Sequence, residues 1–258
     1  MKKVCLCYFS GTGMTKYVVN RLVSEIEKHN VSVDIFKIEE TDGQGIDMTQ
    51  YDGLIMAYPT HSLNAPKIVI NFAKRLPKAS GVNTFVINTC SVESNSTHGS
   101  SQLLNKKLNK RGYKVLYNKL VEMPSNFASK DTEKQVITTL AKADALAVVM
   151  AKDIINLEHH FVERSFGAKT LTALARIEWL GAPIIGKFIY TKASCTRCKK
   201  CVNNCPNKNI ILNKKSIKFK LSCGLCMRCV YKCPENAIYI RKPFKFIRFD
   251  KWYDNDAI

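Results

Sequence analysis

The chain has 258 residues, 46% of them apolar, and carries 40 Lys and Arg against 21 Asp and Glu, for a formal net charge of +19. This length and composition exclude a disordered chain and allow a buried core in one large domain or two smaller ones.

Short β-rich runs alternate with helical patterns up to about residue 152. Strands are expected at 3–9, 31–38, 53–58, 84–90 and 113–121. Helices are expected near 14–29, 65–76, 98–111 and 131–152, where apolar residues recur three and four apart. Connections of this length imply parallel pairing with right-handed crossovers. The pattern predicts a doubly wound α/β domain over residues 1–152, with a five-stranded parallel sheet.

A glycine-rich loop, Y-F-S-G-T-G-M-T-K, joins the first expected strand to the first expected helix. Free amides and the dipole at a helix start favour an anion. The loop lacks the spacing of a P-loop, and Lys16 stands where a dinucleotide fingerprint needs its third glycine. Three hydroxyls, from Ser10, Thr12 and Thr15, surround the two glycines. This arrangement suits a single terminal phosphate held by neutral donors.

The segment S-G-T-G-x-T after the first strand resembles the phosphate loop of flavodoxins, with Met14 where asparagine is commonest. The resemblance implies a flavodoxin-like fold that binds FMN. The phosphate would then be held by Ser10, Gly11, Thr12, Gly13, Met14 and Thr15. Flavodoxin-like domains place the flavin ring between the loops after the third and fourth strands, at the switch point of the sheet. The ring contacts that this implies are Tyr58, Pro59, Thr60, His61, Thr89, Cys90 and, from a later loop, Phe127.

Two residues near the expected flavin ring are candidates for catalysis. Cys90 ends the fourth strand, where a thiol could protonate or attack a substrate, and a small apolar strand-end residue is the alternative interpretation. His61 could bond a flavin carbonyl or donate a proton to a substrate, and an ordinary exposed loop histidine is the alternative. His98 is a third candidate proton donor. Cys5 and Cys7 alternate on a central strand and are expected only to pack.

Residues 153–193 are expected to form a helical linker. Apolar residues at helical spacing predict a helix packed on the rest of the protein, and peripheral membrane contact is the alternative. These residues are Leu171, Leu174, Ile177 and Leu180. Arg176, Glu178 and Lys187 argue against a transmembrane span, because their burial in hydrocarbon is expensive.

Two further expectations concern the same linker. Gly181, Pro183 and Gly186 are expected to break its helical pattern. His159 and His160 are adjacent, so on a helix they point apart and make a poor metal pair. We expect them on a solvated face.

Two cysteine repeats of the form C-x2-C-x2-C-x3-C-P lie within residues 194–240, 28 residues apart. The cytoplasm keeps thiols reduced, so in a cytoplasmic chain metal ligation is expected rather than disulfides. Zinc ribbons pair distant C-x2-C knuckles with four ligands per ion, which differs from this run of three cysteines plus one.

The repeat spacing resembles that of bacterial two-cluster ferredoxins, in which the fourth cysteine of each run ligates the other cluster. The resemblance implies a small α+β domain over 194–240 with two [4Fe-4S] clusters, followed by a basic-aromatic tail at 241–258. Cluster one would be held by Cys195, Cys198, Cys201 and Cys233. Cluster two would be held by Cys223, Cys226, Cys229 and Cys205.

The whole chain resembles the flavodoxin-ferredoxin fusions, also described as 4Fe-4S flavoproteins and found widely in anaerobes. The resemblance implies an oxidoreductase that passes electrons from a low-potential donor through two [4Fe-4S] clusters to FMN, and on to an acceptor that is a small organic molecule if the protein is an enzyme. A pure electron carrier between redox proteins is the alternative, and a redox-responsive nucleic-acid-binding sensor is a third hypothesis. The acceptor and the direction of flow stay open.

The N-terminal residues lack the apolar core and cleavage site of a signal peptide, so a cytoplasmic location is expected. Bound clusters and a phosphate would leave the net charge at about +13. We therefore expect an acidic electron carrier such as a small ferredoxin, or an anionic substrate, as partner. The sequence has no recognised nucleic-acid motif. Oligomeric state stays open, with a dimer as one option.

Overall fold

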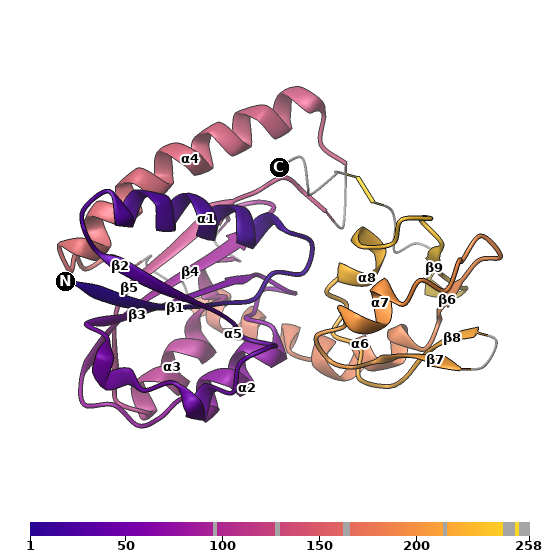
Figure 1. Ribbon diagram of the computed structural model, residues 1–258, viewed down its shortest axis with the longest axis horizontal. Helices are drawn as coiled ribbons and strands as arrows, with labels where there is room; N and C mark the ends of the chain where they lie inside the picture. The colour runs from indigo at the N-terminus through magenta and orange to yellow at the C-terminus, as the bar shows by residue number, and fades with distance from the viewer. Residues whose placement is uncertain (95–96, 127–129, 162–165, 214–215, 245–250, 253–258) are drawn as a thin grey trace. The chain divides into compact units, whose positions relative to one another are not determined.

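The computed structural model describes the chain except residues 95–96, 127–129, 162–165, 214–215, 245–250 and 253–258. The chain forms two compact units, which are described separately below (Figure 1). The first unit comprises Met1–Pro124 and Thr132–Ala175, and the second comprises Ser125–Asp131 and Arg176–Ile258.

The first unit is built on a five-stranded parallel sheet with the order β2-β1-β3-β4-β5. Its strands are β1 (Lys3–Tyr8), β2 (Ser32–Lys37), β3 (Gly53–Pro59), β4 (Val82–Cys90) and β5 (Tyr113–Glu122). The direction of winding changes between β1 and β3, which makes this the switch point of the sheet. The order is that of the flavodoxin-like fold, so the predicted fold class is confirmed.

Helices cover both faces of this sheet (Figure 1). One face carries α1 (Met14–Glu27) and α4 (Glu133–Ile155), and the other carries α2 (Lys67–Arg75) and α3 (Gln102–Lys110). Because both faces are covered, β1 and β3 are buried almost throughout, and Cys5 and Cys7 are fully buried as expected. The last helix of this unit is α5 (Phe166–Ala175).

The second unit contains two short antiparallel hairpin-like pairs and three short helices. Strand β6 (Ile189–Thr191) pairs with β9 (Ile238–Ile240), and β7 (Ile210–Asn213) pairs with β8 (Ser216–Phe219). The helices are α6 (Glu178–Gly186), α7 (Lys200–Asn203) and α8 (Arg228–Tyr231). The apolar residues of these strands form one core with residues from α7 and α8.

The 28-residue sequence repeat is also a repeat of the backbone. Helices α7 and α8 begin 28 residues apart, and β7 and β9 do so as well. Left-handed residues recur at the same interval: Arg197 and Leu225, Lys199 and Met227, Lys208 and Asn236. Since strands of one repeat pair with strands of the other, the two halves form one core.

The expected packing of the apolar residues at 171–180 is wrong. Leu174 is 68% exposed, Ile177 is 74% exposed and Leu180 is 71% exposed. One long helix does not form, because α5 ends at Ala175 and α6 begins at Glu178. Small residues make the buried contacts instead: Thr172 in α5, and Ala182 and Gly186 in α6.

The expected helix breaks are also wrong in part. Gly181 and Pro183 lie inside α6, and only Gly186 marks its end. Proline keeps helical φ and loses only one backbone hydrogen bond, which a nine-residue helix tolerates here. Within the described ranges, no helix combines the length and the apolar character needed to cross a bilayer.

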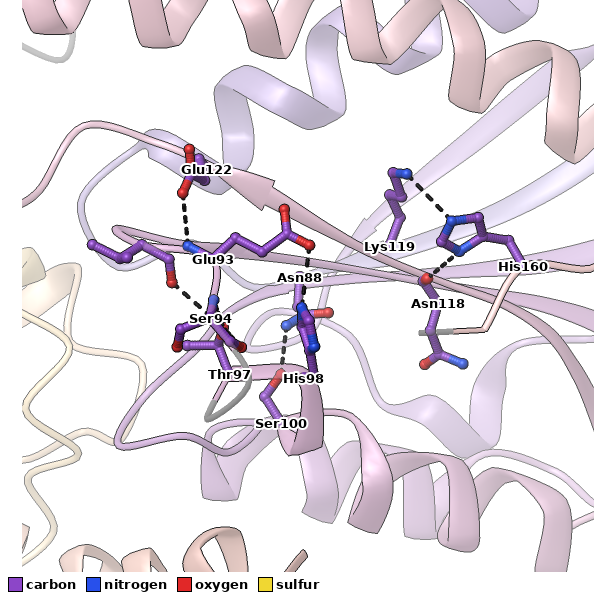
Figure 2. A network of polar contacts seen from close by, with 11 residues as sticks. Asn88, Glu93, Ser94, Thr97, His98, Ser100, Asn118, Lys119, Glu122 and His160 are labelled. Carbon is purple, nitrogen blue, oxygen red and sulfur yellow. Dashed lines mark hydrogen bonds and ion pairs between the residues drawn. The ribbon is translucent and has the colours of Figure 1, made fainter. Parts of the chain in front are cut away.

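His160 is not on a solvated face, in contrast to the expectation for this histidine. It forms an isolated parallel bridge with Tyr117 at the edge of β5, and its ring lies 5.2 Å from the Tyr117 ring. Its Nδ1 lies 2.9 Å from the carbonyl oxygen of Asn118, and its Nε2 lies 3.3 Å from Lys119 Nζ (Figure 2). The sheet edge therefore captures one of the two adjacent histidines, while His159 stays exposed.

Candidate functional site

The loop between β1 and α1 places three hydroxyl groups at the start of a helix. Ser10, Thr12 and Thr15 are all at least nine-tenths buried. Ser10 Oγ accepts hydrogen bonds from the backbone N–H groups of Gly13 at 3.2 Å and Lys16 at 3.3 Å. These bonds are long, so a charged phosphate oxygen, which forms shorter and stronger ones, can replace them.

The start of α1 has the electrostatic character of an anion site. Gly13 occupies the N-cap with φ of 111°, a conformation that glycine adopts without strain. The N-cap makes no side-chain hydrogen bond, and the first turn of α1 carries no acidic residue. The partial positive charge of the helix start therefore has no carboxylate opposing it from this turn.

The loops after β3 and β4 are tied to each other and to the phosphate loop. Thr15 Oγ1 and Thr89 Oγ1 lie 2.8 Å apart, and the Thr60 N–H donates to the carbonyl of Thr89 at 2.7 Å. Asn88 Nδ2 donates to Thr60 Oγ1 at 3.0 Å and to Ser100 Oγ at 2.7 Å, the second of which is drawn in Figure 2. The predicted ring-contacting loops thus meet at the carboxyl edge of the sheet, beside its switch point.

His61 lies in the loop after β3 and is partly exposed. Its backbone pairs with that of Asn64, and its ring lies edge-on to Phe9 with ring centroids 6.5 Å apart. Burial of the imidazole among its neighbours lowers its pKa to about 4. The ring is therefore neutral at pH 7 and can accept or donate one hydrogen bond, but it is a poor general acid.

Cys90 ends β4 and is 9% exposed. Burial, followed by the charges of Glu122 and Glu93, raises the pKa of its thiol to about 12. Glu122 Oε1 accepts from the Glu93 N–H at 2.7 Å, and His98 Nε2 lies 3.3 Å from Glu93 Oε1 (Figure 2). A thiol with this pKa is protonated at pH 7, so the environment favours a packing role over a nucleophilic one.

Of the other predicted ring contacts, Tyr58 is fully buried and Pro59 is partly exposed. Phe127 lies outside the described residues. The structure joins its loop to β4 through the N–H of Met123, which donates to the Cys90 carbonyl at 2.8 Å.

Eight cysteines of the second unit line two separate cavities. Cavity one is lined by three cysteines of the first repeat, Cys195, Cys198 and Cys201, and by Cys233 from the second. Cavity two is lined by Cys223, Cys226 and Cys229 of the second repeat and by Cys205 from the first. Each cavity therefore brings together three thiols from one repeat and the fourth thiol of the other.

Backbone amides point at the sulfurs in a repeated pattern. The Asn209 N–H donates to Cys205 Sγ, and the Ala237 N–H donates to Cys233 Sγ, both at 3.2 Å. The Leu225 N–H donates to Cys223 Sγ at 3.4 Å. Such N–H groups stabilise negative charge on sulfur, which ligated thiolates carry.

The two cavities differ in their surroundings. Thr196, Arg197, Lys199 and Lys200 line cavity one and are all exposed. At matching positions cavity two has Gly224, Leu225 and Met227, which are less exposed and uncharged. Cavity one is therefore the more cationic and the more open to solvent.

The donor set fits iron-sulfur clusters. All eleven cysteines are free thiols, and burial raises the pKa of Cys201 to about 11 and that of Cys223 to about 12. A bound metal centre stabilises the thiolate form and displaces these protons. Among the described residues, no three His, Cys, Asp or Glu side chains are grouped tightly enough to hold one metal ion. A four-iron cluster is wider than one ion, and its ligands surround a cavity.

The strand order and the loops define a flavodoxin-like first unit, and known structures with this architecture resemble it. A flavodoxin from the domain Archaea matches with 15% identity, covering 59% of this chain and 99% of its own, with a TM-score of 0.38. Flavodoxin 1 from Bacillus cereus matches with 18% identity over 57% of this chain and 97% of its own, with a TM-score of 0.40. General stress protein 14 from Treponema denticola, solved with FMN, matches with 8% identity over 60% of this chain and 99% of its own, with a TM-score of 0.43.

No protein-family model and no curated protein sequence matches the chain. The fold assignment of the first unit rests on its strand order and not on these distant similarities.

Sequence reasoning missed several residues at both sites. Asn88 and Ser100 connect the loops after β3 and β4, and Gly186 of α6 lies directly against Cys223. Asn209 lines cavity two with its side chain 1% exposed, and Asn207 lines the same cavity. The one signal available in the sequence was the difference between the repeats, C-P-N-K-N-I against C-P-E-N-A-I.

Proposed function

We propose that this protein is an electron-transfer flavoprotein of the flavodoxin-ferredoxin fusion type, with an FMN-binding first unit and a second unit that holds two [4Fe-4S] clusters. The observation that carries the proposal is the lining of the two cavities by three cysteines of one repeat and the fourth of the other. This is the ligand exchange that two-cluster ferredoxins use.

FMN would bind at the carboxyl edge of the parallel sheet, at the switch point. Ser10, Thr12 and Thr15 would hold its phosphate together with the backbone N–H groups at the start of α1. The loops after β3 and β4, fixed by Asn88 and Thr89, would orient the ring. Bound FMN accepts one or two electrons, whereas an iron-sulfur cluster carries one at a time.

The eight cavity cysteines would hold the clusters. Cys195, Cys198, Cys201 and Cys233 would ligate cluster one, and Cys223, Cys226, Cys229 and Cys205 would ligate cluster two. The N–H groups of Asn209, Ala237 and Leu225 stabilise the thiolates electrostatically. Together the two units would convert between one-electron and two-electron transfer.

A carrier without a small-molecule substrate is the second candidate, and the acid-base properties of the first unit favour it. Efficient general acids have a pKa near the working pH. His61, with a pKa of about 4, and Cys90, with a pKa of about 12, lie on either side of that range. Neither side chain is suited to deliver a proton to an organic acceptor at pH 7, so electrons would leave toward another redox protein.

The partner that delivers electrons would be an acidic carrier that docks at the exposed, cationic mouth of cavity one. Arg197 and Lys199 face that cavity, whereas the matching residues of the second repeat, Leu225 and Met227, are uncharged. Opposite charges accelerate encounter and lose their effect at high salt. Free thiols throughout the chain suit a reducing compartment, so we place the protein in the cytoplasm.

Anaerobic reconstitution, followed by quantification of iron and FMN, tests the proposal. We expect about eight iron atoms and about one FMN per chain. Cys233→Ser should lower the iron content, because it removes one ligand of cavity one, while Cys90→Ser, outside both cavities, should leave it unchanged. Failure of the wild-type protein to bind iron, or equal iron loss in both variants, would contradict the cluster assignment. Failure to bind FMN would contradict the assignment of the first unit.

The docking surface is tested by reduction kinetics with an acidic ferredoxin at low and high ionic strength. The double variant Arg197→Leu and Lys199→Met introduces the side chains of the second repeat and should slow reduction at low salt. Lys142→Met with Lys152→Met removes the same charge from exposed positions of α4 and is the matched control. Equal slowing in both double variants would show that net charge, and not this surface, attracts the partner.

A further inference from the structure

Asn209 occupies a special position beside cavity two. It follows Cys205 by four residues, and its side chain is 1% exposed. Its backbone N–H donates to Cys205 Sγ at 3.2 Å, and its carbonyl accepts from the Lys220 N–H at 2.8 Å. The residue is therefore fixed on both sides by its main chain.

The side-chain amide of Asn209 is oriented by a second contact. Its Oδ1 accepts a hydrogen bond from the Ser222 N–H at 2.7 Å. A backbone N–H can only donate, so the oxygen of the amide must face Ser222 and the nitrogen must face away. Among the residues that the structure describes, the buried Nδ2 has no hydrogen-bond partner.

A buried amide without an acceptor costs free energy, and such groups usually have a partner. Asn209 lines cavity two together with Cys205, Cys223 and Cys226. An acceptor placed in this cavity would satisfy Nδ2. Sulfur that carries negative charge is such an acceptor, and it is what a cluster would bring into the cavity.

We infer that Asn209 Nδ2 donates a hydrogen bond to a sulfur of cluster two and so raises the reduction potential of that cluster; this inference rests on the proposed function. Reduction adds one electron to the cluster and increases the negative charge on its sulfurs. An N–H donor stabilises the reduced state more than the oxidised state, so the potential rises. Asn209 is a positioning and tuning residue and not a ligand.

The other repeat supplies an internal comparison. Ala237 stands 28 residues after Asn209, donates its N–H to Cys233 Sγ at 3.2 Å and accepts from the Lys192 N–H at 2.9 Å. The backbone contacts of the two residues are therefore the same, but Ala237 has no side-chain amide. The additional donor acts on cluster two alone.

This difference also explains where the amide is placed. Cavity one has exposed cations in its lining, which stabilise a reduced cluster electrostatically. Cavity two has Leu225 and Met227 at the matching positions, and low exposure without charge lowers a cluster potential. Asn209 opposes that lowering, which keeps the potentials of the two clusters closer together than their surroundings alone would.

The test is a redox titration of the reconstituted holoprotein, followed by electron paramagnetic resonance. Asn209→Ala should lower the midpoint potential of one cluster by about tenfold in its reduction equilibrium, 59 mV for a one-electron couple, and leave the other cluster unchanged. Ala is tolerated at this backbone position, because Ala237 occupies its equivalent. Asn204→Ala removes a surface amide that bonds the Lys200 carbonyl at 2.8 Å and is the matched control.

A second readout separates a donor from a purely structural contact. In protein with side-chain ¹⁵N-labelled asparagine, the reduced wild type should show a nitrogen hyperfine coupling to the cluster that Asn209→Ala lacks and Asn204→Ala retains. Unchanged potentials and an unchanged coupling in Asn209→Ala, with full iron content, would overturn the inference while the proposed function stands. Absence of iron in the wild type would instead overturn the proposed function, and this inference with it.

Discussion

Gly186 offers a sharp test of how closely α6 packs on the cysteine-rich core. It is the last residue of α6, and a Cβ added there would lie 2.2 Å from Cys223 Cβ and 3.1 Å from Cys223 Sγ. Carbon atoms in proteins do not approach closer than about 3.0 Å. In Gly186→Ala the helix and Cys223 would have to separate by about 0.8 Å or more, although alanine by itself favours a helix.

Overpacking of this kind costs about 1–3 kcal/mol, so we expect Gly186→Ala to destabilise the second unit by that amount. Gly181 lies in the same helix with nothing within 4 Å of an added Cβ. Gly181→Ala should therefore stabilise the unit by about 0.5–1 kcal/mol. The same substitution, five residues apart in one helix, is expected to have opposite signs.

The two tryptophans, Trp179 and Trp252, both belong to the second unit, so tryptophan fluorescence follows the unfolding of that unit in urea. We expect a lower urea midpoint for Gly186→Ala and a higher one for Gly181→Ala, with unchanged slopes. Gly186→Ala should also bind less iron, because Cys223 lines cavity two. A Gly186→Ala protein that is as stable as Gly181→Ala and binds iron like the wild type would refute the reasoning.

Two predictions concern the first unit. Thr15→Val removes the buried 2.8 Å hydrogen bond to Thr89 and should destabilise the protein by about 1 kcal/mol and weaken FMN binding in a fluorescence titration, whereas the exposed Thr138→Val should do neither. His61 has a folded-state pKa of about 4 against about 6.5 when unfolded, so below pH 6.5 the unfolded chain binds more protons. The free energy of unfolding of FMN-free protein should fall from about pH 6.5 to about pH 4, by up to about 1.4 kcal/mol per pH unit, and His61→Gln should lack this decrease. An identical pH profile in both proteins would contradict the buried, neutral imidazole.

The sheet could be predicted because parallel strands covered on both faces are nearly continuous apolar runs. All five expected strands exist with ends within two residues of the prediction. The glycine loop was visible because Gly13 must adopt a positive φ. The grouping of the cysteines follows the spacing, since two gaps of two residues and one of three leave little choice of geometry.

Other features depend on contacts that no local pattern contains. The periodicity of Leu174, Ile177 and Leu180 predicts a helical stripe, but the partner that would bury it is a tertiary property, and the structure leaves these side chains exposed. The Asn88 amide joins residues 28 and 12 positions away, so its role required the folded sheet. His160 likewise depends on the edge of β5, which lies far from it in sequence.

The crossed lining of the two cavities has a consequence for how this unit can be divided. Each cavity is completed by a cysteine from the other repeat, and the strands of the two repeats are paired with each other. Deleting one repeat would therefore leave no complete cavity, instead of leaving one of two. A polypeptide with a single repeat would complete its four-cysteine sites only by associating with a second copy about a twofold axis, so the duplicated chain achieves within one molecule what a symmetric dimer achieves with two.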